Sequence, residues 1–203
     1  MRDLLVLCAD LNARATIEAI LSRPRSLQTR PIDFEVRHNP IGADGGTRAH
    51  GVSILRAALG SFSHAMMVFD WEGCGASGDP EVIERDLTAR LAADWANRAL
   101  AIVLDPELEA WLVGAHRHFG KVSGVDVADA RQWLAEREWW PRQQDKPARP
   151  KEALEAWLRA HGARRTSANY RRIMKAASLR VESCRCASFR RFATALRRWF
   201  PAQ

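Results

Sequence analysis

Three short apolar segments constrain the fold more than any other feature of this chain. They are residues 4–9, 64–69 and 99–104, each about as long as a typical strand and separated by segments with helical patterning. Strands that are apolar on both faces and alternate with helices are typical of a parallel sheet covered by helices on both sides. The sequence therefore predicts an α/β fold with a mostly parallel sheet flanked by helices.

Weaker signals indicate the remaining elements. Residues 32–37 alternate apolar and polar side chains, as a half-exposed edge strand does. Helices are expected over 13–22, 48–59, 80–95, 127–137, 150–161, 168–177 and 187–199. The strand signal stops near residue 120. We therefore expect an α/β core over residues 1–120 and a basic α-helical C-terminal appendage over residues 121–203, packed on that core.

Acidic side chains stand where the apolar segments end. Asp10 follows the first segment, Asp70 and Glu72 follow the second, and Asp105 and Glu107 follow the third. In an open α/β sheet the carboxyl ends of the strands form the ligand crevice. Carboxylate oxygens are the ligands that Mg²⁺ prefers. The pattern predicts a site for Mg²⁺ or Mn²⁺, with Asp70, Glu72, Asp105 and Glu107 as candidate ligands.

Helix capping is an alternative explanation for one of the two acidic pairs. The tripeptide Asp-Pro-Glu occurs at 79–81 as well as at 105–107, and it is a favourable start for a helix. Asp70 and Glu72 instead precede a glycine-rich segment, and in extended backbone their side chains share one face. A solvated turn is the alternative there, and metal binding is favoured over it.

The third apolar segment is followed by two glutamates. If a helix starts at residue 105, the side chains of Glu107 and Glu109 point about 200° apart around its axis. We therefore expect only Glu107, which is nearer to the strand end, to reach the site.

A glycine-rich segment, residues 42–46, precedes the helix expected at 48–59. Its glycines would let backbone amides approach a phosphate, with Thr47 as the helix cap, but the segment matches neither the P-loop nor the dinucleotide fingerprint. A loop without a ligand is the favoured interpretation. Arg48 and His50 are secondary catalytic candidates, for phosphate contact or for stabilising charge in a transition state.

Charge is divided unevenly along the chain. The net charge of +7 combines −5 over residues 1–140 with +12 over residues 141–203. A basic surplus of this size favours a polyanionic partner, and nucleic acid is the one we expect, although a solvated helical face explains any single pair. The arginines that suit phosphate contacts are Arg164, Arg165, Arg171, Arg172, Arg190, Arg191, Arg197 and Arg198.

Two further expectations concern location. No apolar run approaches the roughly 20 residues that span a bilayer, so no membrane partner is expected. The N-terminal segment has an acid at position 3 and reads as a strand instead of a signal peptide, which predicts a cytoplasmic protein.

The acidic strand ends resemble those of Toprim-like domains, the metal-binding α/β module of topoisomerases, primases and overcoming-lysogenization-defect nucleases. That family carries an acid after its first strand and an Asp-x-Asp after a later one, and Asp10 and Asp70-Trp71-Glu72 stand at those places. Residues 105–111 also resemble a motif of prokaryotic Toprim-like proteins encoded in anti-phage defence loci. This chain departs from the family at Asp10, where a general acid/base Glu is usual, and in having Asp-x-Glu.

These observations together predict a Mg²⁺-dependent phosphodiesterase that acts on DNA in anti-phage defence, with Asp10 holding metal or moving a proton. Two alternatives stay open. One is a non-catalytic subunit of a defence complex, with a degenerate site and a surface for nucleic acid or protein. The other is a phosphohydrolase of small molecules.

Overall fold

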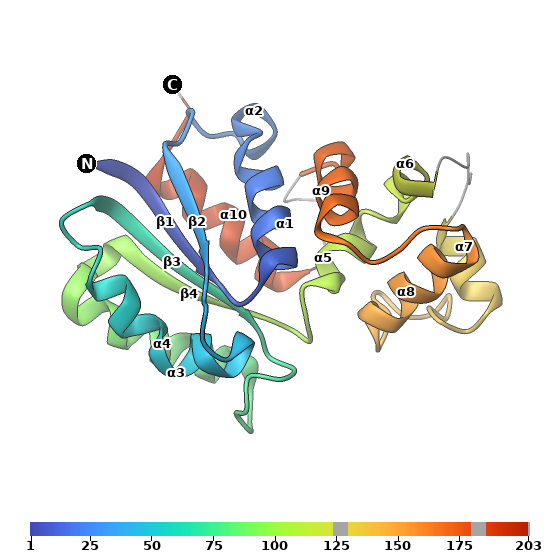
Figure 1. Cartoon of the computed structure of the whole chain (residues 1–203), viewed down its shortest axis with the longest axis horizontal. Helices are drawn as coiled ribbons and strands as arrows, with labels where there is room; N and C mark the ends of the chain where they lie inside the picture. Colours follow the sequence, from blue (N-terminus) through green and yellow to red (C-terminus); the bar gives the residue numbers. More distant parts are fainter. Residues whose placement is uncertain (124–129, 180–185, 203) are drawn as a thin grey trace.

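Four parallel strands form the sheet in the computed structural model, which describes residues 1–123, 130–179 and 186–202 (Figure 1). They are β1 (Arg2–Cys8), β2 (Phe34–His38), β3 (Phe62–Asp70) and β4 (Ala99–Leu104), in the spatial order β2-β1-β3-β4. The chain passes from β1 to one neighbour, β2, and then crosses to the other neighbour, β3. The carboxyl ends of β1 and β3 therefore flank a topological switch point, where open α/β sheets bind ligands.

The strands are apolar on both faces, as the sequence predicts. Leu4 and Val6 of β1 point into one buried cluster, whereas Leu5 and Leu7 point into another on the opposite face. This alternation follows from the strand period of two residues.

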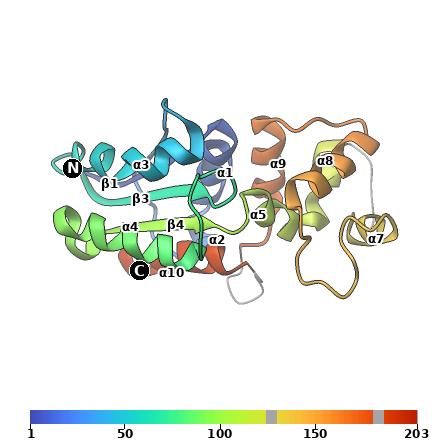
Figure 2. The same ribbon diagram turned by 90° about the horizontal axis from the view of Figure 1, so that it is seen from below.

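Helices cover both faces (Figures 1 and 2). Helices α3 (Ala43–Arg56) and α4 (Pro80–Trp95) cover one face, and α1 (Leu11–Leu21) and α10 (Ala187–Trp199) cover the other. The predicted α/β class, with a parallel sheet flanked by helices, is confirmed.

The other helices are short, and most lie beyond the carboxyl ends of the strands, to the right of the sheet in Figure 1. They are α2 (Pro24–Leu27), η1 (Ala96–Arg98), α5 (Glu109–Gly114), η2 (His116–His118), α6 (Gly120–Ser123), α7 (Ala130–Glu136), α8 (Pro150–Ala160) and α9 (Ser167–Ala176). Helix α9 packs along α1 and so ties this group to the sheet. None of the described helices is long and apolar enough to cross a membrane.

The basic C-terminal region is helical where it is described, and its last helix belongs to the sheet layers. Phe192 and Leu196 of α10 share one buried cluster with Val6 of β1 and with Trp157 of α8. The packing is therefore continuous across residue 120, and the domain boundary there stays a prediction. Residues 127–129 of the helix predicted over 127–137 lie outside the described residues.

The glycine-rich segment 42–46 is the start of a helix instead of a loop, because α3 begins at Ala43. A side chain at Gly46 would place a Cβ only 1.8 Å from the carbonyl oxygen of Ile41, so a glycine is required where the chain passes the first turn. Thr47 is not the cap, since its hydroxyl donates to the carbonyl of Ala43 at 2.8 Å. The helix predicted over 48–59 therefore begins earlier than expected, at Ala43.

Side chains of α4 cover the free edge of β4. The backbone N–H of Val103 donates to Glu84 Oε2 at 2.8 Å, and that of Ala101 donates to Thr88 Oγ1 at 3.1 Å. Arg191 of α10 reaches round this edge, with its Nε 2.5 Å from Glu84 Oε1. These contacts pair N–H groups that an edge strand would otherwise leave unpaired, and they join the two helix layers.

Candidate metal centre

A cavity of about 390 Å³ opens at the carboxyl ends of β1, β3 and β4. Its lining is strongly acidic: Asp10, Asp44, Asp70, Glu72, Glu107, Glu109, Glu152 and Glu155. The cationic side chains in the lining are those of Lys151 and Arg165. Because such acids repel one another when ionised, this arrangement favours a bound cation or bound protons.

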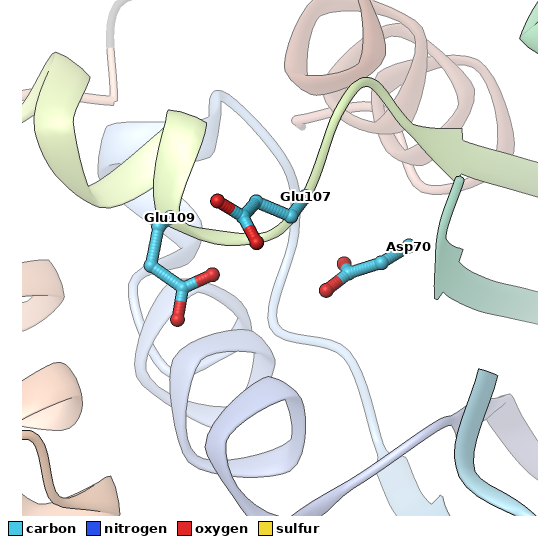
Figure 3. Close-up of side chains that lie close together, drawn as sticks. All are labelled: Asp70, Glu107 and Glu109. Carbon is cyan, nitrogen blue, oxygen red and sulfur yellow. The ribbon is translucent and has the colours of Figure 1, made fainter. Parts of the chain in front are cut away.

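Three of these acids converge into one cluster, drawn in Figure 3. Asp70, Glu107 and Glu109 each offer a carboxylate oxygen, and these oxygens lie within 4.8 Å of one another. We call these three residues the acidic triad. An all-oxygen donor set of this charge fits a hard divalent cation such as Mg²⁺ or Mn²⁺.

Asp70 is fixed by hydrogen bonds at the end of β3. Its Oδ1 accepts from the backbone N–H of Leu108 at 2.8 Å, and its own N–H donates to Asp44 Oδ1 at 2.8 Å. Asp44 lies in the first turn of α3, so this helix and the segment after β4 together orient the strand end.

Glu107 and Glu109 both belong to the triad, so the prediction that only Glu107 reaches the site is wrong. The chain is not helical before residue 109, where α5 begins, so the helical angle between the two side chains does not apply. Glu107 Oε1 accepts from the backbone N–H of Lys151 at 2.8 Å, at the start of α8. Helix α8 thus presents an N–H group and its positive dipole end to this carboxylate.

Glu109 is held by two side chains from the region after α8. The hydroxyl of the fully buried Tyr170 donates to Glu109 Oε1, and Arg165 Nη1 lies 3.2 Å from the same oxygen. Arg165 also pairs with Glu155, at 2.9 Å. Burial raises the pKa of Tyr170, and the neighbouring Glu109 raises it further, so the hydroxyl remains a donor.

The electrostatic state of the cavity follows from burial and like charge. Burial raises the pKa of Asp70 well above its usual range, and the charges of Asp44 and Glu109 add to that shift. Burial likewise raises the pKa of Glu107 to about 7 and increases that of Asp44. Without a cation, the cavity therefore retains protons near neutral pH, which a divalent ion would displace.

Three predicted site residues occupy other positions. Asp10 lines the cavity, but its Oδ1 accepts from Ala13 N–H at 2.7 Å and so caps α1. Glu72 lines the cavity outside the triad, because β3 ends at Asp70 and the strand alternation does not continue. The Asp105 side chain is 52% exposed and bonds Lys146 Nζ at 3.0 Å, so the structure does not bring it into the triad.

Arg48 and His50 do not line the cavity. Both lie on α3, where Arg48 Nε donates to the carbonyl of Cys74 at 2.8 Å and His50 is exposed. Their predicted catalytic roles have no geometric support at this centre.

The eight predicted phosphate-contacting arginines divide into two groups. Four have partners within the protein: Arg165 at the triad, Arg171 with Glu18 at 2.6 Å, Arg191 with Glu84, and Arg197 with the carbonyl of Leu27 at 2.9 Å. The other four, Arg164, Arg172, Arg190 and Arg198, are exposed, and the guanidinium of Arg198 lies 5.8 Å from the centre of the Trp199 ring. At least half of the predicted set thus makes contacts within the fold, and the phosphate-contacting role of all eight stays a prediction.

Sequence reasoning missed Asp44, Lys151 and Tyr170. Asp44 carries a usable signal, since it is an acid soon after the second strand, but the glycines around it favour a loop. Lys151 and Tyr170 carried none, because packing brings them from residues far along the chain.

Comparison of this chain with family models, curated proteins and solved structures finds no match in any of the three. The resemblance to Toprim-like domains therefore stays a prediction, and functional inference depends on the site itself.

Proposed function

We propose that this protein is a divalent-metal-dependent phosphodiesterase that acts on DNA, with Mg²⁺ or Mn²⁺ held by Asp70, Glu107 and Glu109. The observation that carries the proposal is the convergence of these carboxylates, of which Glu107 and Glu109 are buried and Asp70 is partly buried, at the switch point of a parallel sheet. When bound there, the metal would polarise the scissile phosphate and lower the pKa of a bound water.

The surrounding residues suit supporting roles. Asp44 orients the backbone at Asp70, and Tyr170 and Arg165 orient Glu109. Such contacts behind the ligands usually tune metal affinity. Lys151 lines the cavity, and its ammonium group has no hydrogen-bond or ion-pair partner among the described residues, so it is available to contact a phosphate oxygen.

Asp10 is assigned the proton transfer. Its Oδ1 caps α1, which leaves Oδ2 to accept a proton from the attacking water inside the cavity. DNA as the substrate is supported by the basic surplus after residue 140, and a role in anti-phage defence by the resemblance of residues 105–111.

The test is conversion of supercoiled plasmid to nicked or linear forms with Mg²⁺ or Mn²⁺. Asp70→Asn keeps the shape of the side chain and removes its charge, and we expect it to lower the rate by about 100-fold or more. Asp105→Asn is the matched control, because it makes the same change at a strand end outside the triad, and its rate should stay near that of the wild type. Equal cleavage by the wild type and Asp70→Asn would reject the metal assignment.

One observation favours a non-catalytic binding subunit as the second candidate. Each acid of the triad already accepts a hydrogen bond within the protein, and Asp10 serves as a helix cap, as in a degenerate site kept for structure. This candidate predicts salt-sensitive DNA binding by the wild type without cleavage at any concentration of Mg²⁺ or Mn²⁺.

A further inference from the structure

A second cavity, of about 790 Å³, lies beside the acidic one and is about twice as large. Helix α5 contributes to both: Glu109 lines the acidic cavity, whereas Trp111 and Val113 line the second. Much of the second cavity is apolar, and the largely buried rings of Trp111, Trp140 and Phe189 form part of its wall. We call this second cavity the aromatic groove.

The charge of the aromatic groove is opposite to that of the acidic cavity. Its lining includes the cations Arg117, Arg131, Arg142 and Lys146 and, among the described residues, a single carboxylate, Asp145. Arg117 and Arg142 are exposed and have no ion-pair partner among the described residues. An occupant that satisfies this lining has to combine apolar or aromatic surface with negative charge.

The wall of the groove that carries Arg142 and Lys146 has a fixed shape, although that segment contains no regular secondary structure. Arg131 donates to the carbonyl of Pro141 at 2.9 Å, and its guanidinium lies 4.2 Å from the centre of the Trp140 ring. The indole N–H of Trp140 donates to the carbonyl of Gln144 at 2.9 Å. Because these contacts hold the segment that bears Arg142 and Lys146, the groove is largely preformed.

Lys146 connects the aromatic groove to the segment that carries the triad glutamates. It lines the groove, and its ammonium bonds Asp105 Oδ2 at 3.0 Å. Asp105 directly follows β4 and precedes Glu107 by two residues. The groove therefore adjoins the segment that leads into the triad.

We infer that the aromatic groove binds an unpaired strand of nucleic acid, whose bases enter the apolar cavity and whose phosphates contact Arg117 and Arg142. Base faces are accessible only in an unpaired strand, because stacking covers them in a duplex. Delivery of this strand to the triad rests on the proposed function, whereas binding in the groove does not need the metal.

The experiment measures fluorescence anisotropy of a labelled oligothymidylate of about 20 nucleotides with the full chain, at low salt and with EDTA. The groove variant is Arg117→Glu with Arg142→Glu. The matched control is Arg164→Glu with Arg172→Glu, which changes the net charge equally at exposed arginines outside the groove. We expect the groove variant to lose at least about 10-fold in affinity and the control less than about 3-fold.

A second readout is the salt dependence of binding. Because two phosphate contacts are removed, the fall of log affinity with log salt should be less steep by about 1.4 in the groove variant. Thermal unfolding of both variants establishes that they are folded. Asp70→Asn should bind the oligonucleotide like the wild type, so a failure of the proposed cleavage is distinguishable from a failure of the groove.

The inference would be overturned by wild-type affinity in the folded groove variant, by an equal loss in the control, or by equally tight binding of a duplex of the same length. Competition by an acidic peptide as effective as unlabelled oligonucleotide would also overturn it, since it would assign the groove to a protein partner.

Discussion

Carboxylates are buried at two places in the described part of the chain, and their charge is balanced differently at each. Under the edge of β4, Glu84 is 7% exposed and pairs with Arg191. At the strand ends, Glu107 and Glu109 are 5% and 4% exposed and cluster with Asp70, while Arg165 contacts one of the three, Glu109. Burial is nearly equal, so the difference between the two places lies in the ratio of carboxylates to cations.

The fold alone explains the buried carboxylate at the sheet edge, but not the triad at the strand ends. Glu84 has a guanidinium and a backbone N–H, which give it a complete structural explanation at the sheet edge. The triad instead gathers like charges, which raises the cost of ionising any one of them. A fold gains no stability from that arrangement alone, whereas a divalent cation would turn the repulsion into coordination.

The largest effect on stability is expected at the sheet edge. Arg191→Met keeps the length of the side chain and removes its charge, which leaves Glu84 buried without a cation. We expect the free energy of unfolding to fall by about 3 kcal/mol, since breaking a buried pair on one side is strongly destabilising. Urea denaturation followed by circular dichroism measures this loss.

The control for that variant is the double replacement Arg191→Met with Glu84→Gln, which removes both charges. Most of the lost stability should return, because no buried charge is then left unpaired. A loss below about 1 kcal/mol in the single variant would show that the pair is not the structural link described.

A smaller effect is expected from pH in the metal-free protein. The pKa of Glu107 is raised to about 7 in the folded state, and the pKa of Asp70 is raised as well. Their protonated forms are favoured by folding, so their contribution is fully present below the pKa of the unfolded chain and is lost as pH rises through about 7. Between about pH 5 and pH 8 the stability should fall by about 2 kcal/mol.

Thermal unfolding in EDTA at several pH values measures this loss, and Glu107→Gln is the comparison variant. Because glutamine does not titrate, the variant should lose much of the pH dependence and be more stable than the wild type at pH 8. An identical pH profile in the two proteins would contradict the electrostatic description of the triad.

The sequence was sufficient for the sheet and for part of the site. The apolar runs at 64–69 and 99–104 correspond to β3 and β4, because an apolar segment of that length between helices has few other uses. Asp70 was identified for the same reason, since the end of a buried strand can be located from the run itself.

The rest of the site depends on local backbone and on tertiary packing. The tripeptide at 79–81 does start a helix, with Asp79 accepting from Glu81 N–H at 2.8 Å, whereas the copy at 105–107 does not. Identical residues thus differ in conformation, and this difference brings Glu109 to the triad. Arg191 illustrates the second limit, because its place among the basic residues gave no sign that Glu84 is its partner.

The most direct test of the central claim is calorimetric titration of Mn²⁺ into the wild type, Asp70→Asn and Glu84→Gln at about pH 8, above the pKa of about 7 of Glu107. The account predicts that the wild type and Glu84→Gln bind the ion alike, while Asp70→Asn loses binding by about 100-fold or more. Equal Mn²⁺ binding by Asp70→Asn and the wild type, or none by either, would contradict it.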